Sequence, residues 1–169
     1  MEQAITHQRL LTVLSYNKES GDFTWNIAPA SAAKKGQKAG SRLAKDYWQI
    51  GVDGRDYPAH RLAWFYVHGV WPSNEIDHIN RKKNDNRFCN LREATRSQNH
   101  QNRDLYSNNT SGFSGVGWHE RDQKWRVKLK VNGRVKHVGA FEDKELAALV
   151  SIEARVKYHP FYVLVVVQP

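Results

Sequence analysis

The sequence predicts an α+β protein made of two compact parts, and three observations lead to this prediction. Short stretches in which polar and apolar residues alternate, as in half-buried strands, recur along the chain. Two pairs of such stretches are joined by the hairpin turn signals Asp53-Gly54 and Asn132-Gly133. A run rich in Asn, Ser, Thr and Gly at 102–114 then interrupts the pattern, so we expect domains at 1–106 and 107–169.

Composition restricts the class of protein. Of 169 residues, 26 are Lys or Arg and 17 are Asp or Glu, and the formal charge of +9 favours a polyanionic partner. No stretch resembles a signal peptide or approaches the roughly 20 apolar residues that cross a bilayer. We therefore expect a cytoplasmic protein with no membrane partner. The one cysteine, Cys89, cannot form a disulfide or a Cys₄ zinc site, so we expect no structural zinc and place Cys89 in an apolar core.

The first part is predicted to build a small α+β module before its most distinctive segment. Thr6 has the position of an N-cap, and the residues after it have apolar side chains near helical spacing. The predicted elements are, in order, a helix near 5–14, a strand at 23–25, strands at 47–52 and 55–58, and a helix over 60–69.

The segment 75–103 carries the strongest pattern. The sequence Thr95-Arg96-Ser97-Gln98 has the form of a capping box, which predicts a helix from Arg96 with Asn99 in its first turns. In order, the segment predicts a strand at 75–79, a polar loop at 80–86, a second strand at 90–93 and this helix.

Four residues of this segment resemble the HNH nuclease motif. The pairs Asp77-His78 and Asn90-Leu91 and the triplet Ser97-Gln98-Asn99 match the phage and homing-endonuclease branch, written Asp-His, Asn-Leu and Ser-x-Asn. Asn90 and Asn99 follow His78 by 12 and 21 residues. The resemblance implies a ββα-metal fold and metal-dependent cleavage of phosphodiester bonds in double-stranded DNA.

The resemblance also implies a role for each residue. His78 would be the general base, Asp77 and Asn99 the metal ligands, and Asn90 the residue that holds the loop and orients the imidazole. These residue types suit the reaction, because an imidazole with a pKa near about 6.5 accepts a proton at neutral pH. Carboxylate and amide oxygens suit Mg²⁺ or Mn²⁺. An incidental polar hairpin, the simpler interpretation, would have no reason to carry all four residues.

A looser resemblance concerns the residues before the motif. Gly21-Asp-Phe-Thr-Trp and His60-Arg61-Leu62-Ala63-Trp64 resemble the module that precedes this type of HNH segment in phage proteins. Two interpretations of His60 and Arg61 stay open: they face DNA or the active site, or they anchor their helix to the nuclease core. Arg61 is therefore included among the candidate DNA contacts.

The second part has the order β-β-β-α. Its predicted elements are strands at 115–119, 124–131 and 134–138 and a helix over 143–158. We expect four apolar side chains of the helix to face inward: Leu146, Leu149, Val150 and Ala154.

Residues 111–159 resemble the AP2 DNA-binding domain. Ser-Gly-Phe-Ser-Gly-Val, Lys-Trp-Arg-Val and Val-Gly-Ala-Phe-Glu-Asp-Lys-Glu-Leu-Ala-Ala carry the resemblance, which implies that the sheet enters the major groove. Because paired residues share a face, a turn at Asn132-Gly133 places one cationic set together. That face holds Arg126, Lys128, Lys130, Val135 and His137, with Lys136 on the other side at the rim. Trp118 and His119 are further candidate contacts, and a merely solvated face is the alternative.

Together these patterns predict a metal-dependent DNA endonuclease that nicks or cleaves double-stranded DNA at chosen sites, as a monomer or weak homodimer. A non-catalytic DNA-binding protein with a vestigial HNH core is the main alternative, although all four motif residues are intact. Cleavage of RNA or of structured DNA is a third possibility.

Overall fold

The chain divides into two compact units. The computed structural model describes residues 5–28 and 33–164 of the chain, and the units are residues 1–96 and 97–169. The polar stretch at 102–114, where the sequence predicted a boundary, lies inside the second unit. Within the described ranges, no helix is both long and apolar enough to cross a membrane.

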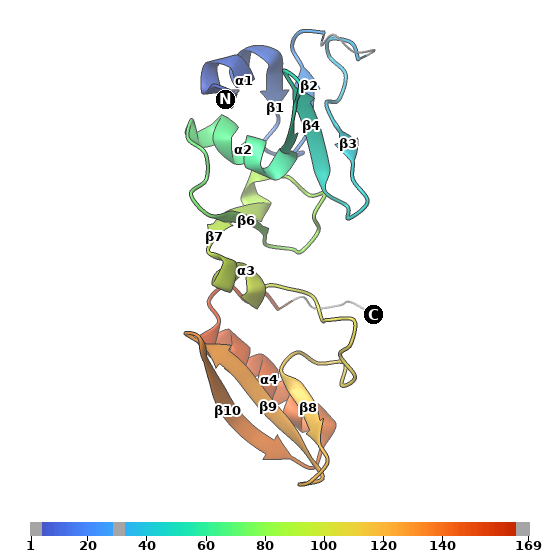
Figure 1. Cartoon of the computed structure of the whole chain (residues 1–169), viewed down its shortest axis with the longest axis vertical. Helices are drawn as coiled ribbons and strands as arrows, with labels where there is room; N and C mark the ends of the chain where they lie inside the picture. The colour runs from blue at the N-terminus through green and yellow to red at the C-terminus, as the bar shows by residue number, and fades with distance from the viewer. Residues whose placement is uncertain (1–4, 29–32, 165–169) are drawn as a thin grey trace. The chain divides into compact units, whose positions relative to one another are not determined.

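The first unit combines short helices with three small antiparallel sheets, so the α+β prediction is confirmed (Figure 1). Its sheets are β1–β2, β3–β4–β5 and β6–β7. The elements in chain order are α1 (His7–Val13), β1 (Leu14–Tyr16), β2 (Phe23–Trp25), β3 (Ser41–Arg42), β4 (Trp48–Val52), β5 (Arg55–Pro58), α2 (Ala59–His68), β6 (Glu75–His78), the 3₁₀ helix η1 (Phe88–Asn90) and β7 (Leu91–Ala94).

The local signals in the sequence explain where several of these elements begin and end. Thr6 caps α1 by accepting a hydrogen bond from the backbone N–H of Arg9 at 3.2 Å. Asp53 and Gly54, which join β4 to β5, have φ values of 51° and 77°, as a type I′ turn requires. Gly69 ends α2 in the left-handed conformation.

One apolar core holds the first unit together. Leu10 of α1, Phe23 of β2 and Leu62 of α2 are almost completely buried in it. Ile76 of β6 and Leu91 of β7 belong to the same cluster. The β6–β7 hairpin is therefore fixed by packing against the elements that precede it, rather than by its own few hydrogen bonds.

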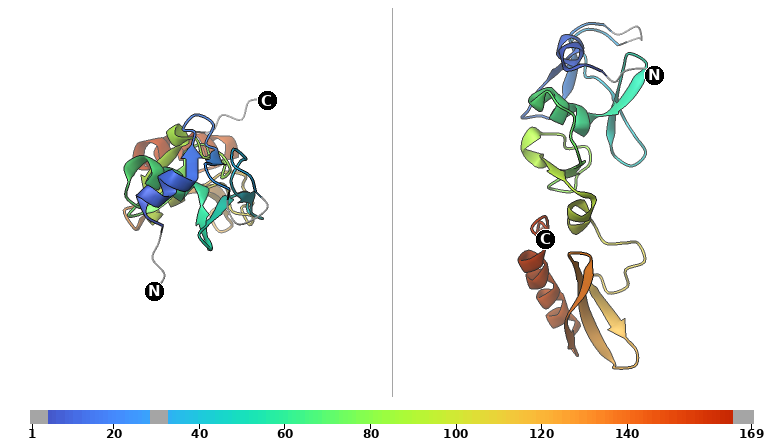
Figure 2. Two further views of the ribbon diagram at one scale, coloured as in Figure 1. Left: turned by 90° about the horizontal axis from the view of Figure 1, so that it is seen from above. Right: turned by 60° about the vertical axis from the view of Figure 1, so that its left-hand side comes forward.

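The second unit is a three-stranded sheet with one helix on one face. Its elements are α3 (Arg96–Gln101), which begins at the division, β8 (Val116–His119), β9 (Lys124–Val131), β10 (Arg134–Phe141) and α4 (Lys144–Tyr158). The strand order is β10–β9–β8, and α4 lies along the sheet (Figure 2). Val116, Val127 and Ala147 form the buried centre of this unit.

The register of the β9–β10 hairpin is the one that the sequence predicts. Val135 pairs with Lys130, and His137 pairs with Lys128. The third strand is longer than expected because it continues to Phe141 beyond a bulge between His137 and Gly139. A bulge lets a strand bend and continue its pairing with one extra residue.

The prediction that Leu146 and Leu149 face inward is wrong. Their side chains are 48% and 61% exposed. The buried residues of α4 are mostly small: Ala147, Ala148, Ser151, Ala154 and Arg155. Ser151 donates a hydrogen bond to the carbonyl of Ser114 at 2.6 Å, so α4 presents to the sheet a face that permits close approach of backbones.

Gly21 is expected to tolerate alanine much less well than Gly54, although their φ values of 78° and 77° are matched. Alanine at either position pays about 1–2 kcal/mol for the left-handed backbone. At Gly21 a Cβ would also lie 2.4 Å from the Arg87 nitrogen, whereas at Gly54 it would meet no atom within 4 Å. Urea unfolding should therefore show a larger loss of stability for Gly21→Ala than for Gly54→Ala. Equal losses would contradict the close approach of Gly21 to Arg87.

Candidate functional site

Two polar residues at the end of β6 are buried. Asp77 and His78 are each 5% exposed, and in the β6–β7 pairing they lie opposite Arg92 and Leu91. Buried polar groups require hydrogen-bond partners, since an unpaired one costs free energy. The neighbourhood of β6 must therefore supply polar contacts as well as apolar packing.

Arg92 supplies the contact for Asp77 from the neighbouring strand. Its Nε and Nη2 atoms lie 2.8 Å and 2.7 Å from the same carboxylate oxygen, Oδ2. Charge-assisted hydrogen bonds of this kind are stronger than neutral ones. They hold the Asp77 carboxylate in one orientation and compensate its charge.

The imidazole of His78 contacts a residue of the following loop. Its Nε2 atom lies 3.2 Å from Oδ1 of Asn86, which is itself buried. An amide oxygen only accepts hydrogen bonds, so Nε2 carries the hydrogen. In that tautomer the other ring nitrogen, Nδ1, carries no hydrogen.

The surroundings of His78 keep this ring neutral. Burial lowers the pKa of His78 below its usual value, and Lys83 acts in the same direction. The hydrogen bond to Asn86 and the charges of Asp77 and Asp85 oppose that shift without cancelling it. A neutral imidazole is the form that a general base requires.

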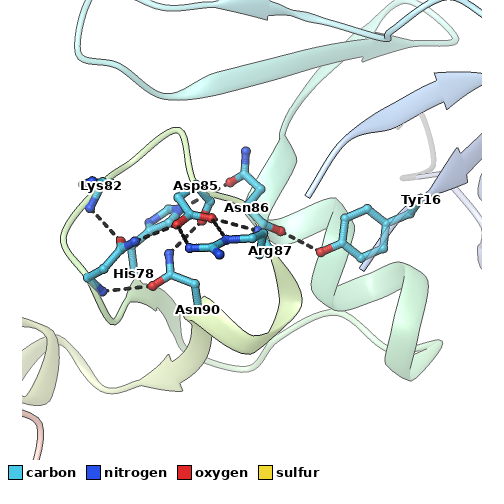
Figure 3. A network of polar contacts seen from close by, with 8 residues as sticks. Tyr16, His78, Lys82, Asp85, Asn86, Arg87 and Asn90 are labelled. Carbon is cyan, nitrogen blue, oxygen red and sulfur yellow. Dashed lines mark hydrogen bonds and ion pairs between the residues drawn. The ribbon is translucent and has the colours of Figure 1, made fainter. Parts of the chain in front are cut away.

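Asn90 holds the two ends of the loop that follows β6 (Figure 3). Its Oδ1 accepts a hydrogen bond from the backbone N–H of Asn80 at 2.9 Å, and its Nδ2 donates to the carbonyl of Asp85 at 2.8 Å. One side-chain amide therefore satisfies backbone groups five residues apart in the loop. The resemblance to the HNH motif implied that Asn90 holds this loop and orients the imidazole, and its role in orienting the imidazole stays a prediction.

Asp85 is the second residue whose side chain makes several hydrogen bonds within this loop. It accepts hydrogen bonds from Nε and Nη2 of Arg87 at 2.8 Å and 2.6 Å and from Nδ2 of Asn80 at 2.6 Å. The hydrogen bonds from Arg87 are the largest cause that lowers the pKa of Asp85 to about 2. The carboxylate is therefore ionised wherever the protein is folded near neutral pH.

Tyr16 ties the loop to the N-terminal elements. Its hydroxyl, on β1, donates a hydrogen bond of 2.6 Å to the carbonyl of Asn86. Burial raises the pKa of Tyr16, so the hydroxyl keeps its proton. The residue that contacts His78 is thus held through its backbone by a residue 70 positions earlier in the chain.

Sequence reasoning missed Asp85, Asn86 and Tyr16. The loop was recognised as polar, but several Asn and Asp residues in it are equivalent by composition. Only the folded path of the loop distinguishes the one that reaches His78. Cys89 was placed in a core, which is wrong, because its side chain is exposed on η1.

Two further residues of this region were predicted to be functional, Arg61 and Asn99, and they lie on different helices. Arg61 donates hydrogen bonds to the carbonyls of Asn74 and Pro72 at 3.0 Å and 3.3 Å, so its guanidinium holds the segment before β6, as the anchoring interpretation requires. Asn99 lies on α3 and belongs to the second unit. Among the described residues, no group of three or more His, Cys, Asp or Glu side chains is placed to hold a metal ion.

The predicted cationic face of the second unit is present on the β8–β10 sheet. Val127 and Leu129 are buried, whereas Lys128 and Lys130, which alternate with them, are exposed. The face opposite α4 therefore carries the side chains predicted to share it: Arg126, Lys128, Lys130, Val135 and His137. Lys136 lies on the other side, with its Nζ 4.7 Å from the ring centroid of Tyr158.

The β8 strand contributes a hollow to the cationic face, whereas its Trp118, a predicted DNA contact, lies on the opposite face. Gly117 pairs with Arg126, and the absence of a side chain there leaves a hollow of about 230 Å³, lined by residues 115–119, Arg126 and Lys128. Trp118 pairs with Trp125, its ring 5.1 Å away, and the register puts both on the face toward α4. His119 alternates with Trp118 and belongs to the cationic face.

Arg126 is paired with an acidic residue within the second unit. Its guanidinium contacts Asp122, and His119 Nδ1 lies 3.4 Å from the same carboxylate. The hydrogen bond from Arg126 is the largest cause that lowers the pKa of Asp122. Part of the positive charge on this face is therefore compensated locally.

A comparison with known families found a match in the first of these regions. A family model described as HNH endonuclease matches residues 57–101, which include Asp77, His78, Asn90 and Asn99. The match supports an HNH nuclease with DNA as its substrate. Searches of curated proteins and of solved structures found no significant match. The homing branch and the AP2-like character of the second unit remain predictions.

Asp85→Asn is expected to lower stability at pH 7 and to do so less as the solution is acidified. A carboxyl group whose pKa is lowered by folding stabilises the protein above its unfolded pKa, about 3.9 for Asp. This stabilisation disappears as the pH falls toward the folded value of about 2. The difference in urea midpoint between wild type and variant, measured at pH 7, 5, 4 and 3, should therefore begin to shrink below about pH 4 and be reduced to roughly half at pH 3. A difference that stays constant with pH would contradict the role of the Asp85 charge.

Proposed function

We propose that this protein is a metal-dependent endonuclease that hydrolyses phosphodiester bonds of double-stranded DNA, with His78 as the general base. The observation that carries the proposal is the neutral, buried imidazole of His78, held through Nε2 by Asn86, inside the segment that matches HNH endonucleases. Hydrolysis needs a group that removes a proton from water, and a neutral imidazole can accept that proton.

The neighbouring residues position this base. Asn86 fixes the tautomer and the ring plane of His78, while Asn90 and Asp85 hold the loop that carries Asn86. Tyr16 restrains the backbone of the loop from β1. A base placed in this way loses little entropy when the substrate binds, which is the advantage of a preorganised site.

The metal ligands in this proposal are Asp77 and Asn99. Carboxylate and amide oxygens are suitable donors for Mg²⁺ or Mn²⁺. A bound divalent cation would supply charge stabilisation for the departing 3′ oxygen. Arg92 compensates the charge of Asp77 through Oδ2, so Arg92 also helps to set the affinity of this carboxylate for a cation.

In this proposal, the cationic face of the second unit binds the DNA. The exposed side chains of Lys128 and Lys130 and the hollow beside Arg126 support the assignment. Long cations that alternate with buried aliphatic residues can contact phosphates without disturbing the core. One catalytic site treats one scissile phosphate, so a monomer is expected to nick.

His78→Ala is expected to lower the rate of plasmid nicking by a factor of about 10² or more, the usual contribution of a general base. Affinity for DNA should change little, because the side chain is buried. Single-turnover conversion of supercoiled to open-circular plasmid with Mg²⁺ or Mn²⁺ measures the nicking rate. A gel shift in EDTA measures the affinity for DNA. His100→Ala, which removes an exposed imidazole of α3, is the matched control. Wild-type nicking by His78→Ala would mean a different base, and an inactive wild type would favour the non-catalytic alternative.

The double variant Lys128→Ala/Lys130→Ala is expected to bind DNA more weakly and with a flatter salt dependence. Each lost phosphate contact should reduce the slope of log K against log salt by roughly 0.9. Lys136→Ala removes the same charge from the other side of the sheet and should leave the slope nearly unchanged. Fluorescence anisotropy of the whole chain on a labelled duplex, between 50 and about 200 mM salt, compares the three proteins. The same slope for the double variant as for wild type would exclude this face.

A further inference from the structure

A second histidine faces His78 in the first unit. His60 lies in the first turn of α2, and its ring centroid is 5.1 Å from that of His78, with the ring planes at 70°. The two imidazoles therefore make an edge-to-face pair. The pairing alone would not require a histidine, because an apolar aromatic ring could pack in the same way.

One polar atom of His60 has no use in the structure of the described residues. Its Nδ1 atom is buried and has no hydrogen-bond partner among the residues that the structure describes. Leaving such a group unpaired costs free energy. Buried polar atoms of this kind call for an explanation, and one explanation is a partner that arrives with the substrate.

A cation lies close to the rings that surround His60. The ring of Tyr47, just before β4, lies 5.5 Å from that of His60 and 6.2 Å from that of His78. Exposed Lys83 reaches over Tyr47, with its Nζ 5.4 Å from the ring centroid. Three rings and one exposed cation thus gather beside the proposed base, and a phosphate oxygen is a suitable ligand for a donor there.

We propose that His60 is a further catalytic residue, whose Nδ1–H donates a hydrogen bond to an oxygen of the scissile phosphodiester while its ring packs against His78. The inference rests on the proposed nuclease function and names a group outside the four-residue motif. His60 exchanges no proton in this role. It binds the phosphate beside the base and so places the reacting phosphorus within reach of the water that His78 activates.

The protonation of His60 agrees with a neutral donor. Burial, followed by the proximity of His78 and Arg61, lowers the pKa of His60 to about 3. The ring is then uncharged at any pH suitable for the reaction, with one N–H to donate and one nitrogen that accepts. It therefore adds a directed hydrogen bond without a second positive charge beside His78.

Three substitutions of His60 separate this role from packing. Asn can place an amide N–H near the position of Nδ1, Gln places one nearer to Nε2, and Phe keeps the ring but has no donor. We expect His60→Asn to retain most of the single-turnover nicking rate, and His60→Gln and His60→Phe to lose at least about tenfold, as for one lost hydrogen bond. Affinity for DNA in EDTA should fall by less than the nicking rate does. A wild-type rate for His60→Phe would overturn the proposal, as would equal losses in all three variants with unchanged melting temperatures.

A second measurement covers the case in which a variant fails to fold. The wild-type chain, labelled with ¹⁵N-histidine, is titrated with a short DNA duplex in EDTA and again in Ca²⁺. The ring nitrogen signals of His60, assigned through their loss in a folded His60 variant or by sequential assignment, should move when DNA is added, whereas those of exposed His100 should not. Signals of His60 that stay fixed would overturn the contact. If wild type fails to nick with Mg²⁺ or Mn²⁺ while the His60 signals move, the nuclease proposal fails and the phosphate contact stands.

Discussion

The burial of two polar side chains at the end of β6 is the constraint on which the first unit depends. Asp77 and His78 can be withdrawn from water only if polar partners meet them inside. Arg92 arrives from the paired strand, but the partner of His78 comes from an irregular loop. An irregular loop can hold a position only when its own backbone groups are satisfied. Asn90 satisfies two of them, the N–H of Asn80 and the carbonyl of Asp85, and the Asp85 carboxylate adds a hydrogen bond to the side chain of Asn80.

The N-terminal elements contact and position this loop in addition to packing in the apolar core. Tyr16 binds the carbonyl of Asn86, and Gly21 lies so close to the backbone of residues 86 and 87 that no side chain fits between them. The backbone of Phe88 donates a hydrogen bond to the carbonyl of Lys18. A segment more than sixty residues away in sequence thus sets the conformation at the site. This explains why the β6–β7 hairpin, too small to be stable alone, has a defined geometry.

Much of the fold could be predicted from the sequence, because turns and alternation are local signals. The Asn132-Gly133 turn fixed the register of β9 and β10, and therefore the face of each lysine. Which face of α4 packs against the sheet could not be predicted in the same way. Large apolar residues suggested one face, but close packing against a sheet favours small ones, so Leu146 is exposed and Ala147 is buried.

The candidate site was predictable only where spacing along the chain carries the information. The motif pointed to Asp77, His78 and Asn90, whereas Asn86 depends on the path of a loop and Tyr16 on tertiary packing. For His60 the sequence left two interpretations open: that it faces DNA or the active site, or that it anchors its helix to the nuclease core. Its distance to His78 is a tertiary fact, set by the packing of α2 against the core.

The exposure of Cys89 has a practical consequence. It is the one cysteine in the chain and stands on η1 directly before Asn90, the residue that closes the loop. A thiol-reactive fluorophore would attach there at a single position in the wild-type protein, without any substitution. A change in its emission when DNA is added would report on the surroundings of this loop, which makes the region beside His78 accessible to stopped-flow and single-molecule optics.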